Sequence, residues 1–421
     1  MAPGRRAVAS MAGLAAVAAA AAAVGCGTGR RHVVAQGPEL TVYSSLPLDA
    51  ASGARAQDVA DAERLALEQA GGRAGRFRVA LTNLDDADPT RRSWDPGRTQ
   101  LDGRRAASDP ATIAYLGELD PGASAISLPL TNAAGILQVS PGDSLVGLTR
   151  RAGAAPGEPE RYYPAGSRTF VRLVPTDDAQ AEALLGYMGA LRVRRVLLID
   201  DEGAAGHGLA QRMSRTAAQH GIDAVDVREI APGSTDFTGL AGDVARSGAD
   251  AVCFAGSTVS GAPALFAALA AADPTLRLFG SSGVADSVFA AALDPRAARR
   301  TVVVSPVSAP AGTVGVPGRA ALARFQEEFH RRYGHDPDPA AALGYEAMGL
   351  VLSAISDAGV HGNDRAAVVR AALSAQRDGT VVGAYHFDPG GDTSSTSFTG
   401  WRVIDGHLAY DRTLPAATAR S

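Results

Sequence analysis

The sequence of 421 residues contains no lysine, so the 40 residues counted as Lys+Arg are all arginine. A P-loop needs a lysine after its glycines to reach the phosphates of a nucleotide, so this kind of binding site is excluded. Schiff-base enzymes, Ser-x-x-Lys hydrolases and protein kinases are excluded for the same reason. An anion bound by this protein must therefore meet arginine, hydroxyl groups or backbone N–H groups.

The chain also lacks a strong net charge and any basic block. Its 40 arginines and 44 acidic residues give a formal charge of −4 at pH 7, and loss of Arg5 and Arg6 with a leader makes this 38 − 44 = −6. A mildly acidic chain of this kind is not expected to bind nucleic acid. The hydrophobic fraction of 46% is typical of a folded globular protein, and the length predicts two domains.

Cysteine is nearly absent, since only Cys26 and Cys253 occur. Cys253 lies in an apolar run of strand type, where a thiol packs as a small hydrophobic group. No disulfide and no metal site built from cysteine is therefore predicted. The 8 histidines show neither an H-x-x-x-H spacing nor a cluster with cysteine, so no metal and no cofactor is expected.

The N-terminus has the order of an export signal. Arg5 and Arg6 precede an apolar run from Met11 to Val24, which is shorter than the ~20 residues needed to span a bilayer. Small residues then lead to Cys26, as in a bacterial lipobox, where the cysteine is acylated and becomes the new N-terminus. Residues 1–26 are predicted to be a lipoprotein signal peptide and 27–38 a tether. The alternative is a plain secretory signal with an incidental cysteine.

Strand and helix patterns alternate along the next part of the chain, which predicts an α/β fold with parallel sheets. Strands are expected at 40–44, 76–84, 112–116 and 136–139, and helices at 54–70, 96–108 and 124–134. The charged stretch 85–97 contains two prolines and is expected to be a surface loop.

The pattern restarts near Thr169. Strands are expected at 170–174, 195–200, 222–230, 251–255, 276–279 and 301–305, and helices at 177–191, 206–220, 238–247 and 262–272. Helices at 319–333, 340–358 and 365–373 follow, and strands at 381–387, 398–404 and 407–410 come last. Two α/β blocks predict a ligand cleft at the carboxyl ends of the strands.

The loops after the expected strands are small and polar. They lie at 44–45, 117–124, 140–144, 200–208, 256–258 and 280–283. Glycine, serine and threonine ahead of a helix supply N–H groups, hydroxyl caps and the positive end of the helix dipole, which together hold a small anion without a cation. A plain helix cap is the competing interpretation for each residue alone, but recurrence in both blocks favours a shared site.

Motifs of catalysis are missing from these loops. No G-x-S-x-G elbow occurs, and the glycines of 203–208 and 256–261 do not give the G-x-G-x-x-G of a dinucleotide loop. Two acidic pairs, Asp85-Asp86 and Asp200-Asp201, end strands. Because neighbouring strand residues point to opposite faces, turn and capping roles are expected for them. The protein is not expected to be an enzyme.

Short motifs follow one another in a fixed order between residues 40 and 410. They are Leu116-Gly117, Gly135–Pro141, Arg172, Val196–Asp201, Gly206–Ala210, Gly233–Phe237, Ala249-Asp250, Gly280–Gly283, Gly344–Ala347 and Phe387–Gly391. Their order and spacing resemble the substrate-binding proteins of branched-chain amino acid ABC transporters, which are type I periplasmic binding proteins of the leucine-binding-protein kind.

The resemblance implies a particular α/β architecture. Two Rossmann-like three-layer lobes would be joined by a three-stranded hinge and close over a ligand like a Venus flytrap. The hinge crossings are expected near 170–176, 305–310 and 390–399. The first lobe would comprise 39–170 and 306–390, the second lobe 171–305 and 391–412, and residues 413–421 would form a tail.

The resemblance also implies where a ligand binds. In the family, the ligand carboxylate is held at the positions that match 121–124 and 142–144, with Ser124 as the expected hydroxyl donor. Together with the strand-end loops, this gives the candidate ligand-binding residues Ser44, Ser45, Gly122, Ala123, Ser124, Gly142, Asp143, Ser144, Ala205, His207, Ser257, Thr258 and Ser282.

Three of these positions depart from the family. Ala205 and Ser257 stand where aromatic residues often pack the ligand, and Ser282 stands where a glutamate often pairs the ligand ammonium. A buried ammonium needs a paired charge or several acceptors, and Asp143 or Glu118 is the candidate substitute. The departures leave the ligand open among an amino acid, an amide and a related carboxylate.

We therefore expect a monomeric solute receptor that is anchored through Cys26 to the outer face of the cell membrane. It would deliver a small polar metabolite to ABC permease subunits and would work by hinge closure, without a cofactor. The alternatives are a sensor of the same fold that feeds a signalling partner, and an exported hydrolase.

Overall fold

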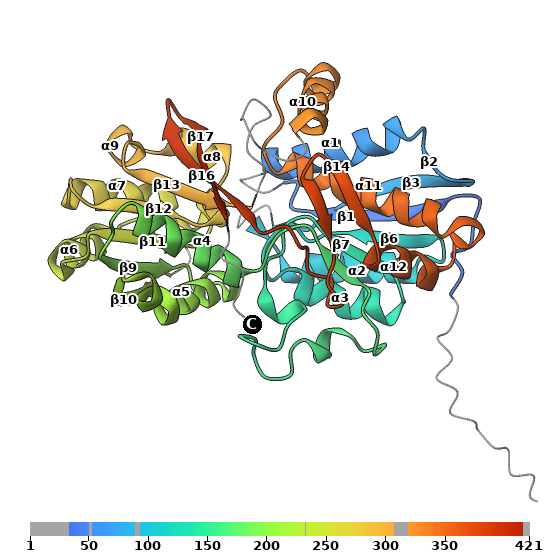
Figure 1. Ribbon diagram of the computed structural model, residues 1–421, viewed down its shortest axis with the longest axis horizontal. Coiled ribbons are helices and arrows are strands. Elements are labelled where there is room, and N and C mark those ends of the chain that lie inside the picture. Colours follow the sequence, from blue (N-terminus) through green and yellow to red (C-terminus); the bar gives the residue numbers. More distant parts are fainter. Residues whose placement is uncertain (1–32, 50–52, 89–92, 232, 307–318, 416–421) are drawn as a thin grey trace, which may run out of the picture. The chain divides into compact units, whose positions relative to one another are not determined.

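The computed structural model describes residues 33–49, 53–88, 93–231, 233–306 and 319–415. The expected signal peptide, Cys26 and the first part of the expected tether lie outside these residues. In the described part of the chain, no helix combines the length and the apolar character needed to cross a bilayer. Two sheets organise the rest, and each is the centre of one lobe (Figure 1).

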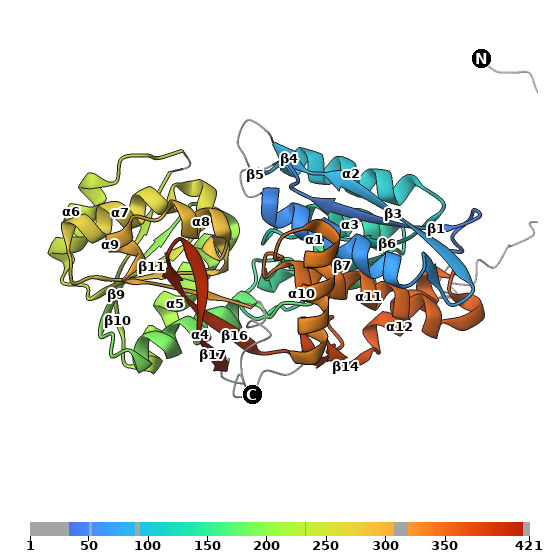
Figure 2. The same ribbon diagram turned by 90° about the horizontal axis from the view of Figure 1, so that it is seen from above.

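The first lobe is built on a six-stranded sheet with the order β2-β3-β1-β6-β7-β8. All its strands run parallel except β2, which pairs antiparallel with β3. Helices α1, α11 and α12 cover one face, and α2 and α3 cover the other (Figure 2). The elements of this lobe are β1 (Leu40–Leu46), α1 (Gly53–Gln69), β2 (Arg73–Ala74), β3 (Phe77–Asp85), β4 (Ala87–Asp88), β5 (Ser93–Trp94), α2 (Pro96–Ser108), β6 (Thr112–Leu116), α3 (Ser124–Ala133), β7 (Leu137–Ser140), β8 (Phe170–Arg172), α10 (Arg319–Tyr333), α11 (Ala341–Asp357), α12 (Arg365–Leu373), β14 (Gln376–Thr380) and β15 (Gly383–His386).

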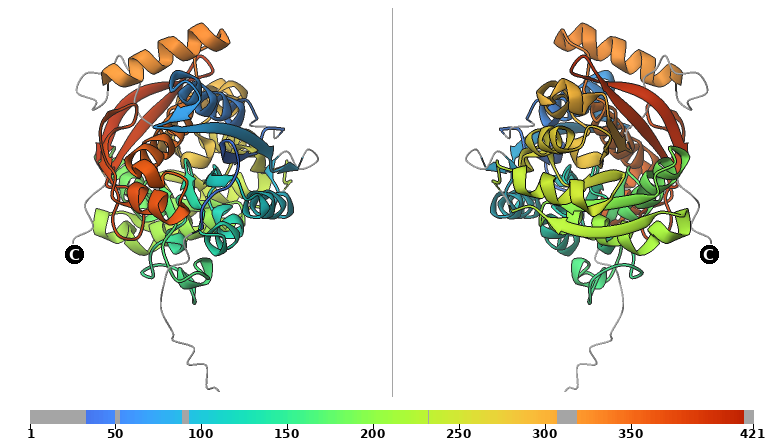
Figure 3. Two further views of the ribbon diagram at one scale, coloured as in Figure 1. Left: turned by 90° about the vertical axis from the view of Figure 1, so that its right-hand side faces the viewer. Right: turned by 90° about the vertical axis from the view of Figure 1, so that its left-hand side faces the viewer.

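The second lobe is built on a seven-stranded sheet with the order β10-β9-β11-β12-β13-β16-β17. Strands β9 to β13 are parallel, and β16 and β17 join antiparallel at the edge. Helical layers lie on both faces of each sheet, as the two end-on views show (Figure 3). The elements of this lobe are α4 (Asp177–Ala190), β9 (Arg195–Asp200), α5 (Ala204–Thr216), β10 (Asp223–Glu229), α6 (Thr238–Ser247), β11 (Ala251–Ala255), α7 (Ala262–Ala272), β12 (Arg277–Gly280), α8 (Ser287–Ala292), α9 (Pro295–Ala298), β13 (Thr301–Ser305), β16 (Ser397–Ile404) and β17 (His407–Pro415).

The central strands are apolar because both of their faces are covered. Every residue of β6, β11 and β13 is buried. Cys253 in the middle of β11 is fully buried, as expected, and burial raises the pKa of its thiol. The apolar runs from which strands were predicted thus form the central strands of the two sheets. The loops at the ends of these strands are the predicted ligand-binding loops.

The chain passes between the lobes near the places that the resemblance implied. It leaves the first sheet after β8, returns after β13 through residues that are mostly outside the described part, and crosses again between β15 and β16. A buried ion pair links two of these crossings, since Arg172 Nε donates to Asp392 Oδ1 at 2.7 Å. Arg172 also donates to the carbonyl oxygen of Leu145 at 2.7 Å, which fixes the loop after β7 to the hinge.

Two expected boundaries need correction. Residues 33–36 were assigned to a tether, but Ala35 donates its N–H to the carbonyl oxygen of Asn363 at 2.7 Å and is buried. This segment is therefore part of the first lobe. Residues 413–415 were assigned to a tail, but they continue β17 opposite β16, because Phe398 pairs with Leu414.

Candidate ligand-binding site

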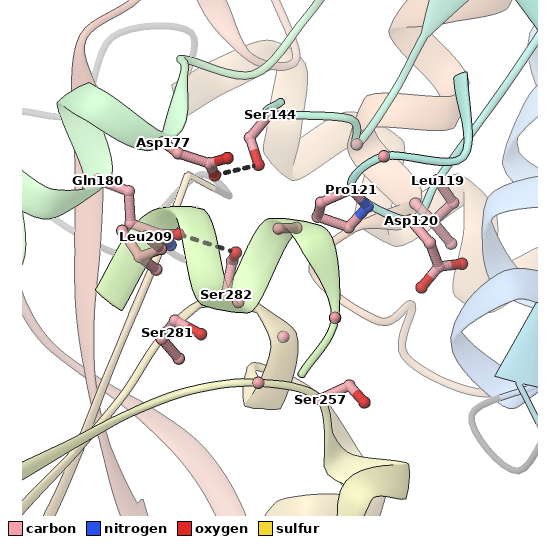
Figure 4. A pocket seen from close by; sticks show the side chains of 18 of the residues that line it. Leu119, Asp120, Pro121, Ser144, Asp177, Gln180, Leu209, Ser257, Ser281 and Ser282 are labelled. Carbon is pink, nitrogen blue, oxygen red and sulfur yellow. Dashed lines mark hydrogen bonds between the residues drawn. The ribbon is translucent and has the colours of Figure 1, made fainter. Parts of the chain in front are cut away.

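A cavity of about 340 Å³ lies at the carboxyl ends of the strands and takes residues from both lobes (Figure 4). This volume suits a small metabolite. The first lobe and the hinge contribute Pro47, Arg55, Trp94, Leu119, Asp120, Pro121, Gly122, Gly142, Ser144, Val174, Pro175, Pro306 and Leu343. The second lobe contributes Asp177, Gln180, Asp201, Gly203, Ala205, Gly206, Leu209, Ala255, Gly256, Ser257, Thr258, Val259, Ser260, Ser281, Ser282, Gly283, Asp286 and Phe398.

The cavity contains about half of the residues predicted from the strand-end loops. The loops had been predicted because carboxyl ends of parallel strands meet at one edge of a sheet. The predicted residues that line the cavity are Gly122, Gly142, Ser144, Ala205, Ser257, Thr258 and Ser282. The predicted residues outside its lining are Ser44, Ser45, Ala123, Ser124, Asp143 and His207.

Asp143 is turned away from the cavity and caps the start of α3. Its Oδ1 accepts hydrogen bonds from the N–H groups of Gly122 at 2.8 Å and Leu145 at 3.0 Å, and its Oδ2 accepts from Ser124 N–H at 2.8 Å. Burial raises the pKa of Asp143, and these three donors oppose that shift. Asp143 therefore occupies the donors that were expected to hold a ligand carboxylate.

The two other candidates near this helix are also engaged within the lobe. The Ser124 hydroxyl is buried and accepts from Glu118 N–H at 3.2 Å. Glu118 is buried in turn, and its Oε1 accepts from the Tyr115 hydroxyl at 2.8 Å. Burial, together with the charge of Asp86, raises the pKa of Glu118. Neither Glu118 nor Asp143 faces the cavity as a substitute for the missing glutamate.

The remaining candidates outside the lining lie beneath or beside it. Ser45 donates to Asp102 Oδ2 at 3.0 Å, and Ser44 is buried beside Glu63. Ala123 is fully buried. His207 lies on the first turns of α5, with its Nδ1 near the carboxylates of Asp200 and Glu229.

Two aspartates form the part of the lining with the most unusual electrostatics. Asp177 is 6% exposed, and its Oδ1 accepts from the Ser144 hydroxyl at 2.6 Å. Burial raises the pKa of Asp177 to about 6, against the hydrogen bond from Ser144. Burial also raises the pKa of Asp120 to about 6, and the charge of Arg55 opposes this shift. These carboxylates lack enough local donors to offset their desolvation.

The other two lining aspartates have structural partners. Asp201 accepts from Ser257 N–H at 3.0 Å and from the Ser260 hydroxyl at 2.7 Å through Oδ2. Asp286 caps α8 by accepting Phe289 N–H at 2.7 Å. Asp201 thus holds the loop after β11, and both carboxylates have donors from the protein itself.

Several lining residues were not predicted. Asp177 and Gln180 come from the first turn of α4, directly after a hinge crossing, and Arg55 comes from the first turn of α1. An acidic residue at a helix start is ordinary, so Asp177 carries no sequence signal. Arg55 does carry a sequence signal of function, because an arginine in the first turn of a helix lies unfavourably close to the positive end of the helix dipole. The Gln180 Oε1 accepts a hydrogen bond from the Ser282 hydroxyl at 3.2 Å, which connects α4 to the loop after β12 (Figure 4).

Comparisons with known proteins agree with this architecture. A Leu/Ile/Val-binding protein, BraC3, of Rhizobium johnstonii is 25% identical over 369 residues, which cover 86% of this chain and 90% of that one. The leucine-binding protein LivK of Thermotoga maritima has a TM-score of 0.75 at 18% identity and covers 89% of this chain and 99% of its own. A solute-binding protein of an ABC transporter from R. palustris, solved in complex with benzoate, has a TM-score of 0.74 at 18% identity and covers 91% of this chain and 98% of its own.

The family model for periplasmic binding proteins matches residues 45–399, which is most of the chain. The match includes both lobes and all three hinge crossings, and the neighbouring structures have the same two-lobed α/β fold. The resemblance inferred from short motifs is thus confirmed. This chain belongs to the periplasmic binding protein family.

Proposed function

We propose that this protein is the solute receptor of an ABC importer and that its ligand is a small metabolite with a cationic amine, such as an amino acid. One observation carries the proposal: a cavity between two hinged lobes is lined by the buried carboxylate of Asp177 and the partly buried carboxylate of Asp120. A ligand that touches both lobes favours the closed state, because it makes its full set of contacts only there. In the closed form, the protein would deliver the bound ligand to the permease subunits.

The charge of the cavity favours an amine. Among the described residues that line the cavity, four are aspartates and one, Arg55, is a cation. Asp201 and Asp286 are held by protein donors, so Asp120 and Asp177 are the acidic groups that a ligand must neutralise. A buried charge is costly without a partner, and a ligand ammonium supplies one.

A carboxylate on the ligand has a narrower choice of partners. The N–H groups at the start of α3 are taken by Asp143, so they are not open to it. Arg55 and the hydroxyl group of Ser281 line the cavity and are the donors that we assign to a ligand carboxylate. The proposed ligand therefore has its ammonium against Asp177 or Asp120 and any carboxylate toward Arg55.

Isothermal titration of ligand-free protein, prepared by unfolding and refolding, tests this proposal. The panel contains α-amino acids, diamines, neutral amides, and carboxylates without an amine such as benzoate. We expect heat only from compounds with an amine, and an affinity lowered about 10- to 200-fold by Asp177→Asn, as for loss of a hydrogen bond to a charged group. Asp226→Asn is the matched control, because Asp226 lies on β10 away from the cavity.

The possible outcomes test the receptor role and the proposed class of ligand separately. If no compound in the panel binds, the receptor proposal fails for small metabolites. If carboxylates without an amine bind as tightly as amino acids, the protein is still a receptor, but the roles of Asp120 and Asp177 are wrong.

We further propose that the protein is lipid-anchored through Cys26 on the outer face of the membrane. The support is the order of basic residues, apolar run and cysteine at the N-terminus. Replacement Cys26→Ser is expected to move the protein from the membrane fraction to the soluble fraction and to abolish incorporation of labelled fatty acid. Retention of the variant in the membrane fraction would contradict the anchor.

A further inference from the structure

Three metal-ligating side chains meet at the edge of the second sheet, outside the cavity. Asp200 is the last residue of β9, and Glu229 is the last residue of the neighbouring strand β10. They are registered partners in a parallel ladder, so their side chains leave the sheet on the same face. His207 lies seven residues after Asp200 on α5, which packs against both strands. Three separate elements thus bring one imidazole to two carboxylates.

The distances within this cluster are short. His207 Nδ1 lies 3.3 Å from Asp200 Oδ2 and 3.2 Å from Glu229 Oε1, and all three donor atoms lie within 4.8 Å of one another. Ligands at ~2.1 Å from a metal lie ~3.0–3.4 Å apart at octahedral or tetrahedral angles, so both measured separations suit a shared ion. One imidazole hydrogen, in contrast, cannot point at two carboxylates at once.

Asp200 gives an independent indication of a missing partner. Its side chain is fully buried, and Oδ1 accepts Glu202 N–H at 3.0 Å, which fixes the orientation of the carboxylate. Its Oδ2 is buried and makes no hydrogen bond of good geometry, although His207 Nδ1 lies 3.3 Å away. A buried carboxylate oxygen without a partner is costly, and a cation at this place would remove the cost.

We propose that Asp200, His207 and Glu229 bind a divalent transition-metal ion of the Zn²⁺ class. A neutral imidazole with two carboxylates is a donor set that suits Zn²⁺ and its neighbours, and it leaves at least one position for water. The ion cancels the charge of the two carboxylates. His207 and Glu229 are half-exposed, so the ion can enter from solvent.

The position of the site gives it a structural consequence for ligand binding. The segment between Asp200 and His207 contains Asp201, Gly203 and Gly206, all of which line the cavity. An ion that joins the ends of β9 and β10 to α5 would hold this wall in place. The inference does not depend on the nature of the solute.

Titration of EDTA-treated full-length protein with ZnCl₂ tests the proposal. We expect one equivalent of Zn²⁺ to bind, and a hundredfold excess over the Kd to raise the Tm by about 3 °C. Co²⁺ in place of Zn²⁺ is expected to give a visible d–d absorption band. Both signals should be lost in His207→Ala and in Asp200→Asn, which keeps an acceptor for Glu202 N–H.

His330→Ala is the matched control, because His330 pairs with a single carboxylate, Asp336, at 2.8 Å. It should bind Zn²⁺ as the unaltered protein does. Equal circular dichroism and equal Tm in EDTA show that each variant folds. Absence of Zn²⁺ binding, or binding that survives in His207→Ala, overturns the proposal. A Tm increase with Ca²⁺ or Mg²⁺ but not with Zn²⁺ overturns the assignment to a transition metal.

Discussion

Replacing Glu63 by glutamine should make the free energy of unfolding of the first lobe depend less on pH. Glu63 lies on α1, is fully buried, and neither of its carboxylate oxygens has a hydrogen-bond partner. Burial raises its pKa from 4.5 to about 8, while the Ser44 hydroxyl and the charge of Arg64 oppose the shift. Glu63 is therefore protonated in the folded protein at neutral pH.

The sign and size of the effect follow from proton linkage. The folded state holds this proton more tightly than the unfolded state, so its contribution is fully present below the unfolded pKa of 4.5 and is lost as pH rises toward 8. The difference of 8 − 4.5 = 3.5 pKa units corresponds to about 5 kcal/mol at 1.36 kcal/mol per unit. The free energy of unfolding should thus fall by about 1.4 kcal/mol per pH unit from this residue alone.

Urea unfolding of the unaltered protein and of Glu63→Gln at several pH values from 5 to 8 measures this slope. The difference between the two proteins isolates Glu63, because other groups with raised pKa values, such as Asp86, are present in both. Glu68→Gln is the matched control on the same helix, since Glu68 is exposed and contacts Arg332. Parallel pH profiles for the unaltered protein and Glu63→Gln would refute the reasoning.

Three further predictions concern the cavity and the hinge. Because the pKa of Asp177 is about 6, an amine ligand should bind about tenfold more weakly at pH 5 than at pH 7.5, and Asp177→Asn should reduce this pH dependence in calorimetric titrations. Asp392→Asn leaves the buried Arg172 guanidinium without its carboxylate and should cost about 3–5 kcal/mol in urea unfolding. Gly391→Ala should lower the Tm and cost about 1–3 kcal/mol, because φ is +96° and the new Cβ would overlap the Phe170 carbonyl oxygen.

The elements with a strong apolar pattern were predicted to within a few residues. Strand β9 and helices α2, α6, α7, α10 and α12 have the expected bounds, because each has a clear period or turn residues at both ends. The unpredicted elements are short or polar. Helices α8 and α9 have six and four residues, and β14 (Gln376–Thr380) reads Gln-Arg-Asp-Gly-Thr, which has no alternation. The expected loop 85–97 also contains two short strands, β4 and β5, which pair antiparallel.

The site was harder to predict than the fold because loop composition does not show which polar groups are already satisfied. Ser144 and Ser282 face the cavity, whereas Ser124 accepts a hydrogen bond from Glu118 N–H inside the lobe. Arg55 and Asp177 belong to helix starts that no strand-end rule selects. The cluster of Asp200 and its two partners draws one donor from each of three elements, so no spacing of histidines along the sequence could have shown it.

Asp143 bears on which charge the cavity accepts, because it occupies the donors at the start of α3. The start of α3 offers N–H groups and a positive dipole end, which favour an anion. In this chain the anion is the protein's own, because the Asp143 carboxylate accepts from Gly122 and Ser124 at 2.8 Å each. A ligand carboxylate at this place would meet a fixed negative charge and no free donors. With these donors occupied, Asp120 and Asp177 are the lining carboxylates whose pKa values burial raises to about 6, and a cation would stabilise their charged forms. In the function proposed above, Asp177 on α4 and Asp120 on the first lobe take over the recognition of an amine that the resemblance assigns to a glutamate at the position of Ser282.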